Sequence, residues 1–175
     1  VFSLKTNGTA FTTLHHFPEL LGASETNSQG AKPVSSLVIA GDTLFGVAVI
    51  GGNLGFGTVF TLKTNGTGFA TLRQFNGTTD GFYPRALILS GNRLYGTAST
   101  ILFAMNTDGS GFTNLASFVA PGRGTPYGPI ALSGDRIFDV SAMKCTPPCT
   151  ITLAGVSGAS HGSCRLAPRE AATQG

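Results

Sequence analysis

The side chains best suited to metal chemistry in this chain are two adjacent histidines, His15 and His16. Imidazole nitrogens are common metal ligands, but successive residues of a strand point to opposite faces of its sheet. Two neighbouring histidines in a strand therefore do not readily bind one metal ion. The position of His15 is held by Arg73 and Ala116 in later repeats of the chain, so nothing in the repeat requires imidazole. We predict no metal site and no cofactor.

Acid–base chemistry would have to come from the eight acidic residues. A glycosidase needs two carboxylates at a set separation, and Asp80 and Glu19 lie in predicted loops where they can serve. Three others, Asp42, Asp108 and Asp135, occupy turn positions that asparagine fills in other repeats. That interchange is typical of a side chain that stabilises a turn, and no ligand-dense loop of the kind that binds Ca²⁺ is present. We predict no catalytic residue.

The cysteines are confined to the end of the chain, where Cys145 and Cys149 are separated by Thr-Pro-Pro and Cys164 follows. In an oxidising compartment, Cys145 and Cys149 are placed to form a small-loop disulfide. The alternative is a zinc site that adds Cys164 and His161. Because the spacing is not that of a standard zinc finger, a disulfide or free thiols are the favoured interpretation.

The composition indicates a turn-rich β protein. The chain of 175 residues is long enough for a sizeable core, and charged residues make up 11% of it, against roughly 25% in ordinary soluble domains. The net charge is only +3 and the basic residues are scattered, which argues against nucleic-acid binding. No run approaches the roughly 20 apolar residues of a membrane span. Since the chain begins at Val1 within a repeat, we expect it to be cut from a longer protein.

Two sequence units alternate along the chain, and each occurs three times. A Val-Phe…Thr-Asn-Gly…Phe-x-x-Leu unit and a Leu-x-Leu-x-Gly-Asn/Asp…Leu-Phe/Tyr-Gly unit follow each other in order. The first unit occupies residues 1–14, 59–72 and 102–115, and the second occupies 37–46, 87–96 and 130–138. A fixed period of about 20 to 50 residues is the signature of solenoids, propellers and arrays.

Each full repeat contains four short strand candidates separated by turn signals. In the second repeat these are residues 86–89, 93–99, 101–105 and 112–118. Gly91 and Asn92 join the first two, a glycine-first connection that favours a type II′ hairpin. The repeat therefore predicts a four-stranded antiparallel meander.

The apolar pattern predicts that these meanders are covered on both faces. Phe69, Leu72 and Phe75 place aromatic rings on one face of a strand and leucine on the other. Residues 87–89 are apolar without alternation, as expected for a strand buried on both sides. Four-stranded sheets stacked radially form a β-propeller. A β-sandwich is the main rival, but its strands rarely repeat in sequence. We predict an all-β fold, a partial β-propeller of four-stranded antiparallel blades.

The repeat phase divides the chain into blades. Residues 1–17 form a half blade, 34–75 and 85–118 form full blades, 128–142 form a second half blade, and 143–175 form an irregular, partly disordered tail. Joining the two halves would close a ring of three blades, whereas propellers typically hold about four to eight. An open arc or a fragment of a longer array is therefore expected, and its open edges favour self-association.

Loops of variable length on this constant frame are the expected binding regions. The segment 18–33 carries an insertion, because 33 residues separate Gly8 from Gly41, whereas 25 separate the equivalent glycines of the later repeats. The glycine-rich segment 51–57 is expected to be a flexible loop. The candidate ligand-contacting residues at the loop rim are Asp80, Tyr83 and Tyr127.

One known family shares this arrangement. The segment Gly-Thr-Val-Phe-x-Leu-x-Thr-Asn-Gly-Thr-Gly-Phe-x-Thr-Leu at 57–72, followed by Leu-Ile-Leu-Ser-Gly-Asn-x-Leu-Tyr-Gly-Thr at 87–97, resembles the bacterial GloVer (choice-of-anchor) tandem-repeat family. The resemblance covers residues 1–142 and implies a secreted or cell-surface location with a variable C-terminal anchor. It transfers no catalytic residue. The chain departs from the pattern at Asp139, where earlier repeats hold glycine, and no recognisable anchor follows.

Three functions follow from these expectations. The first is a secreted or cell-surface bacterial scaffold that binds a glycan or protein through its blade loops without catalysis. The alternative is a propeller-type polysaccharide hydrolase or lyase whose site needs further blades. The third is a structural spacer.

Overall fold

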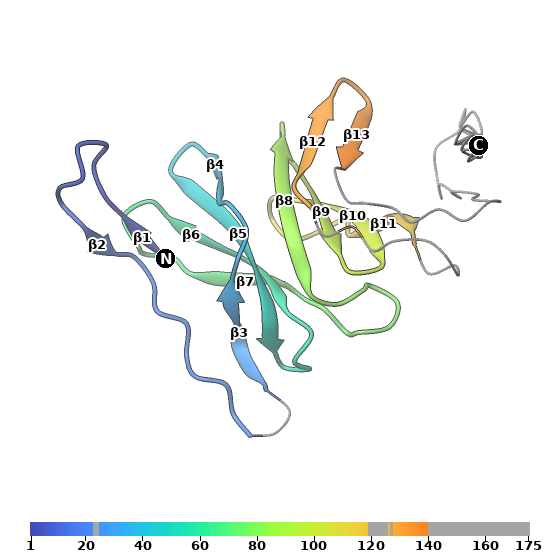
Figure 1. Ribbon diagram of the computed structural model, residues 1–175, viewed down its shortest axis with the longest axis horizontal. Helices are drawn as coiled ribbons and strands as arrows, with labels where there is room; N and C mark the ends of the chain where they lie inside the picture. Colours follow the sequence, from blue (N-terminus) through green and yellow to red (C-terminus); the bar gives the residue numbers. More distant parts are fainter. Residues whose placement is uncertain (23–24, 119–125, 127, 140–175) are drawn as a thin grey trace, which may run out of the picture.

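The computed structural model describes residues 1–22, 25–118, 126 and 128–139. Within these residues the regular structure consists of β-strands, all paired antiparallel, and no helix occurs. The predicted all-β class is confirmed. Figure 1 shows the strands arranged as successive sheets along the long axis of the molecule.

The second repeat folds as the predicted meander. Its strands are β8 (Pro84–Ser90), β9 (Arg93–Ala98), β10 (Ile101–Asn106) and β11 (Thr113–Ser117), and the sheet order is β11-β10-β9-β8. The turn between β8 and β9 has Gly91 at a φ of +56°, in the left-handed region that the first position of a type II′ turn requires. We call these four strands the second sheet.

The first repeat forms a larger sheet than expected. Strands β4 (Val38–Ala40), β5 (Thr43–Gly52), β6 (Thr58–Lys63) and β7 (Ala70–Gln74) follow the predicted meander, and β3 (Asn27–Pro33) joins them. Both β3 and β4 pair with β5, β4 along its first half and β3 along its second. Much of the segment 18–33, expected to be a loop, is therefore a strand. We call these five strands the first sheet.

The expectation of a flexible loop at 51–57 is wrong for its first two residues. Gly51 and Gly52 lie in β5 and are buried. Gly51 has a φ of +77°, and a Cβ there would lie 2.8 Å from the Cα of Gly30 in β3. Glycine is needed here because two backbones approach more closely than a side chain allows.

The two half repeats form separate hairpins. The N-terminal hairpin consists of β1 (Phe2–Ser3) and β2 (Thr12–Thr13), and the C-terminal hairpin consists of β12 (Ile130–Ser133) and β13 (Arg136–Asp139). In Figure 1 the first hairpin lies beyond the first sheet and the second hairpin lies beside β8. The two halves do not join into one sheet. The tail predicted at 143–175 lies outside the described residues.

Apolar residues fill the spaces between successive sheets. One buried cluster joins the first and second sheets, with Phe45 and Val59 from one and Leu94 and Phe103 from the other. A smaller cluster joins the N-terminal hairpin region to the first sheet, where Leu14 packs against Leu62 and its neighbours. The first sheet is therefore covered on both faces. The prediction that Phe69 and Phe75 share one face is wrong, because Phe69 packs against the smaller cluster whereas Phe75 belongs to the larger one.

A stacked pair of phenylalanines occurs three times along the chain. The two rings come from residues nine apart in the sequence, on the third strand of the repeat and just before the fourth. The pairs are Phe2 with Phe11 (5.3 Å between centroids, 29° between planes), Phe60 with Phe69 (5.7 Å, 23°) and Phe103 with Phe112 (5.4 Å, 23°). Similar local geometry in all three copies shows that the sequence repeat is also a structural repeat.

A third phenylalanine from the preceding repeat covers two of these pairs. Phe17 meets Phe60 edge-on, with centroids 5.1 Å apart, and Phe75 meets Phe103 in the same way at 5.5 Å. Edge-to-face contacts are a favoured geometry for aromatic pairs. Each repeat thus inserts one ring into the next, and Phe60 and Phe103 are fully buried as a result.

Candidate functional site

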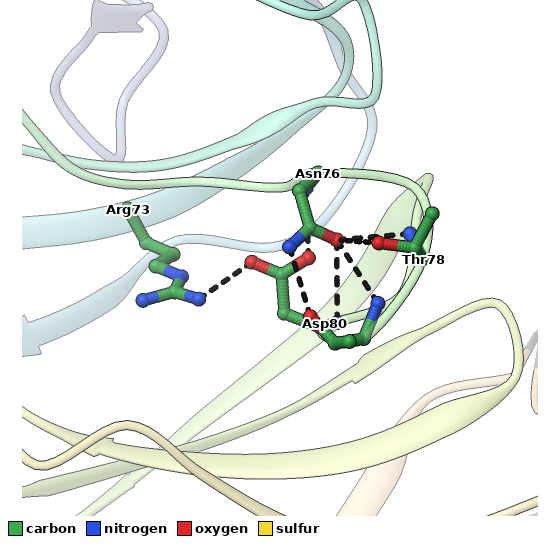
Figure 2. A network of polar contacts seen from close by, with 5 residues as sticks. Arg73, Asn76, Thr78 and Asp80 are labelled. Atoms are coloured by element: carbon green, nitrogen blue, oxygen red, sulfur yellow. Dashed lines mark hydrogen bonds and ion pairs between the residues drawn. The ribbon is translucent and has the colours of Figure 1, made fainter.

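The connection between β7 and β8 is an ordered loop built around Asn76. Its side-chain oxygen accepts hydrogen bonds from the backbone N–H of Thr78 (2.9 Å) and Thr79 (3.1 Å) and from the hydroxyl of Thr78 (3.0 Å). Figure 2 shows these contacts converging on one amide oxygen. An asparagine that bonds to the backbone two residues ahead fixes a turn by itself. The loop is therefore held in one conformation by local bonds.

Asp80 closes the same loop from the inside. Its carboxylate accepts one bond from the Nη2 of Arg73 (2.5 Å) and another from the backbone N–H of Asn76 (2.7 Å). Asp80 is only 3% exposed, and in Figure 2 its carboxylate points toward Arg73 and Asn76. Asp80 lies in the loop that the sequence indicates, but its carboxylate faces inward and stabilises the loop rather than standing at an exposed rim.

Arg73 connects this loop to the neighbouring repeat. Its guanidinium carbon lies 4.1 Å from the centre of the Phe112 ring, a favourable position for a cation over an aromatic face. The same guanidinium forms the ion pair with Asp80. One side chain of β7 therefore anchors both the loop and the packing of the second sheet.

Tyr83 lies at the end of this loop in an unfavourable backbone conformation. Its φ is +53°, and its N–H donates to the carbonyl of Phe56 in the β5–β6 connection (2.9 Å). Tyr83 is 38% exposed, and its ring meets that of Phe82 edge-on with centroids 5.1 Å apart, while the Phe82 ring lies 6.5 Å from that of Phe56. We call Phe56, Phe82 and Tyr83 the aromatic cluster. Two loops that are distant in sequence build it, a pairing that the sequence does not reveal.

A hollow lies between the first and second sheets at the ends that carry the short turns. It has a volume of about 390 Å³ and is lined by Phe45, Leu62, Lys63, Asn92 and Asp108, among others. Sequence reasoning missed it, because turns of two different repeats form its walls.

The polar groups around this hollow are engaged with each other. The Nζ of Lys63 donates to the carboxylate of Asp42 (2.8 Å) and to the hydroxyl of Thr43 (3.0 Å). Mainly because of the bond from Lys63, the pKa of Asp42 lies below its usual value. The bond from the Ser110 hydroxyl lowers the pKa of Asp108 in the same way. No polar group here is strongly buried, so this hollow is the weaker candidate.

The remaining sequence candidates are placed as follows. Tyr127, Cys145 and Cys149 lie outside the described residues. In the described part of the chain, no three histidine, cysteine or acidic side chains gather where they would hold a metal ion. His15 lies half-buried against aromatic rings, whereas His16 is exposed.

No protein-family model matches this chain, and neither does any curated protein. The described residues contain no helix of the length and hydropathy needed to cross a membrane.

Proposed function

We propose that this protein is an extracellular, surface-displayed repeat scaffold that binds a glycan through its aromatic cluster and performs no catalysis. The observation that carries the proposal is Tyr83, a half-exposed aromatic residue held at a positive φ. Strained residues of this kind cost roughly 1–3 kcal/mol and concentrate at ligand sites.

The surroundings of Tyr83 suit a ligand with many hydroxyl groups. Exposed Thr78 and Thr79 belong to the same loop, and the ring of Tyr83 offers an apolar face with a polar tip. The Asn76 and Asp80 hydrogen bonds hold the loop in place before any ligand arrives. Such preorganisation lowers the entropy cost of binding.

The hydrogen bonds that Asp80 accepts favour a binding function over polysaccharide cleavage. A cleaving enzyme needs a carboxyl group that reaches the glycosidic bond, and Asp80 uses both oxygens on Arg73 and the backbone. We infer that substitution of Asp80 disrupts the conformation of the loop and does not remove a catalytic group.

The propeller-like arrangement and the surface location are part of the same proposal. Sheets that cover one another through a repeated aromatic contact are the packing expected of neighbouring propeller blades. The resemblance of residues 1–142 to GloVer repeats supports display outside a bacterial cell. Labelling of intact source cells with an antibody against this chain tests the location.

The binding proposal is tested on a glycan array with the whole chain and the Tyr83→Gly variant. Glycine relieves the positive φ and removes the ring, so we expect at least a ten-fold loss of glycan affinity without loss of thermal stability. Ser99→Gly is the matched control, because Ser99 also has a positive φ of 44° but is buried. Its affinity should equal that of the unmodified chain.

Two results would overturn this function. Equal affinity of Tyr83→Gly and the unmodified chain would exclude the aromatic cluster as the site. Absence of glycan binding would reject the glycan proposal; binding to extracellular proteins instead, lost in Tyr83→Gly, would identify a protein ligand at the same cluster. If nothing binds, the spacer interpretation stands.

A further inference from the structure

The dipeptide Asn-Gly occurs three times in the chain, at Asn7-Gly8, Asn65-Gly66 and Asn76-Gly77. In this dipeptide the backbone nitrogen of glycine reaches the side-chain amide carbon of asparagine easily, because glycine has no Cβ to obstruct it. When that nitrogen loses its proton to hydroxide and attacks, the new C–N bond closes a five-membered succinimide ring, and the side-chain nitrogen leaves as ammonia. Water then opens the ring to aspartate or isoaspartate. All three asparagines are therefore chemically able to undergo deamidation, which needs no other reactant than water.

The three asparagines share their sequence context but not their surroundings. Each is followed by Gly-Thr, so the reactivity that adjacent residues confer is the same for all three. Asn7 and Asn65 lie in the equivalent short turns of two repeats, whereas Asn76 lies in the longer connection between β7 and β8. Any difference in their deamidation rates in the folded protein therefore comes from the tertiary structure.

Asn65 lies in the turn between β6 and β7, where Thr64, Asn65 and Thr67 are exposed. Its Oδ1 accepts hydrogen bonds from the N–H (3.0 Å) and the hydroxyl (2.8 Å) of Thr67. Both donors stabilise the negative charge that develops on this oxygen during attack. The N–H of Gly66, the nucleophile, donates to the carbonyl of Lys63 (2.9 Å). Hydrogen bonds of an exposed turn open at a low cost in free energy, so this nitrogen is readily freed.

The equivalent turn of the next repeat already contains an aspartate, the product of this reaction. Asp108 accepts bonds from the N–H (2.8 Å) and the hydroxyl (2.6 Å) of Ser110, as Asn65 does from the threonine that follows it. The glycines of the two turns, Gly109 and Gly66, have nearly equal φ values of +89° and +86°. Aspartate at position 65 therefore retains the conformation of the turn.

Asn76 lies in a loop that holds both reacting groups in place. The N–H of Gly77, the nucleophile, donates to the carbonyl of Gly81 (3.1 Å), and the N–H of Asn76 donates to Asp80 (2.7 Å). The ring of Phe56 packs on Gly77, since a Cβ there would lie 2.5 Å from its Cε2. Closure of the succinimide ring requires rotation about the bonds of Asn76, which breaks these contacts together. The buried Asp80 carboxylate also opposes the negative charge of the attack.

Freedom of the backbone to rotate, and not activation of the side-chain carbonyl, distinguishes the two kinds of site. The Oδ1 of Asn76 also accepts several hydrogen bonds, so its carbonyl is activated as well. We propose that Asn65 is a site of spontaneous deamidation in the folded protein, whereas the folded loop protects Asn76. Asn7 belongs with Asn65, because its Oδ1 accepts the same two bonds from Thr9 (3.1 and 2.8 Å). The reaction adds negative charge to the turns and leaves the β7–β8 loop unchanged.

The test is incubation of the whole folded chain at mildly alkaline pH, followed by proteolysis and mass spectrometry of the peptides. We expect aspartate and isoaspartate to form at Asn65 at least about ten-fold faster than at Asn76. In a denaturing concentration of urea the two rates should become similar, because both sites read Asn-Gly-Thr. The proposal is overturned if the two rates are equal in the folded chain, if Asn65 stays intact, or if urea leaves the ratio unchanged.

Two variants test whether the loop contacts provide the protection. Phe56→Ala removes the ring that packs on the glycine, and Asp80→Ala removes the carboxylate that holds the Asn76 N–H. Each should raise deamidation at Asn76 at least about three-fold, while Asn65 in the same sample keeps its rate. Leu54→Ala is the matched control, because Leu54 belongs to the same connection as Phe56 but is exposed, and it should change neither rate. An unchanged rate at Asn76 in both test variants would refute the protection.

Discussion

The imidazole ring of His15 lies flat on the ring of Phe69, with centroids 3.8 Å apart and 6° between the planes. Arg73, the equivalent of His15 in the next repeat, lies 4.1 Å over Phe112, the equivalent of Phe69. The same position in successive repeats therefore covers the same phenylalanine of the following repeat with a planar polar group. In the first of these two positions the group is the imidazole of His15, and histidine is the side chain that ordinarily gains or loses a proton near neutral pH.

We predict that protonation of His15 lowers the free energy of unfolding as the pH drops below about 6.5. Burial lowers the pKa of His15, and the N-terminal ammonium and His16 act in the same direction, while Gln29 opposes them. The folded protein therefore binds the proton less readily than the unfolded chain. The contribution of neutral His15 is fully present above the unfolded pKa and is lost as the pH falls through the folded pKa.

Urea unfolding between pH 7.5 and 5 measures this effect. The His15→Gln variant should lose part of the pH dependence, whereas His16→Gln should retain it, since His16 is exposed. Identical pH profiles of His15→Gln and the unmodified chain would contradict the assignment.

Equivalent phenylalanines should differ greatly in their contribution to stability. Phe60→Ala removes a fully buried ring that contacts Phe17 and Phe69 and should cost about 3–5 kcal/mol. Phe2→Ala removes an exposed ring at the same repeat position and should cost less than about 1 kcal/mol. Chemical denaturation of both variants, at concentrations where the chain is monomeric, checks this. Equal losses would mean that the two sites are packed alike.

Gly96 should not tolerate even one methyl group. An alanine Cβ would lie 2.4 Å from the Cζ of Phe103 and 2.8 Å from the carbonyl oxygen of Ala86. Overpacking of this kind costs about 1–3 kcal/mol, measured as a lower free energy of unfolding. Adding Phe103→Leu should recover part of the loss, because leucine has no Cζ. An unchanged free energy of unfolding in Gly96→Ala would show that the ring of Phe103 does not lie this close to residue 96.

Asp108 should be replaceable by asparagine but not by alanine. Its carboxylate accepts bonds from the N–H (2.8 Å) and hydroxyl (2.6 Å) of Ser110, as Asn65 does from Thr67. The unfolding midpoint at pH 7 should stay unchanged in Asp108→Asn and fall in Asp108→Ala.

Acid conditions give Asp108 a second test. Its folded pKa is lowered mainly by Ser110, so its charged-state contribution is present above about pH 3.8 and is lost as the pH falls through the folded pKa. The stability of Asp108→Asn should therefore decline less below pH 4 than that of the unmodified chain. An equal decline would show that the turn does not depend on the charge.

Much of the fold could be predicted because it depends on residues that lie close together in the sequence. Turn residues such as Gly91 and the repeated spacing of phenylalanines predict the strands of the second repeat within a few residues of β8, β9, β10 and β11. The run that contains Phe69, Leu72 and Phe75 is predicted as a strand, and β7 is observed there, whereas in the equivalent run 11–17 only Thr12–Thr13 (β2) form a strand. Turns and strand positions of this kind depend on residues that are adjacent in the sequence, so the sequence pattern predicts them.

The candidate site was predicted only in part. Tyr83 lies on a loop with an exposed ring, but its positive φ and its contact with the Phe56 connection depend on another loop. The sequence predicts Asp80 at the loop rim, whereas its carboxylate is buried and bonded to Arg73 and to the backbone of Asn76. A sequence gives the residue types of a loop, not which of their polar atoms already have partners.

The sequence by itself determined the all-β class, the repeat boundaries and the turn chemistry, because short-range sterics and periodicity decide these. Only the tertiary structure decided that residues 27–33 add a strand and that Asp80 faces inward. It also decided that Phe2 is exposed while its equivalents Phe60 and Phe103 are fully buried. The physical reason is that burial depends on which distant segment supplies the covering atoms, and identical repeats differ in their neighbours.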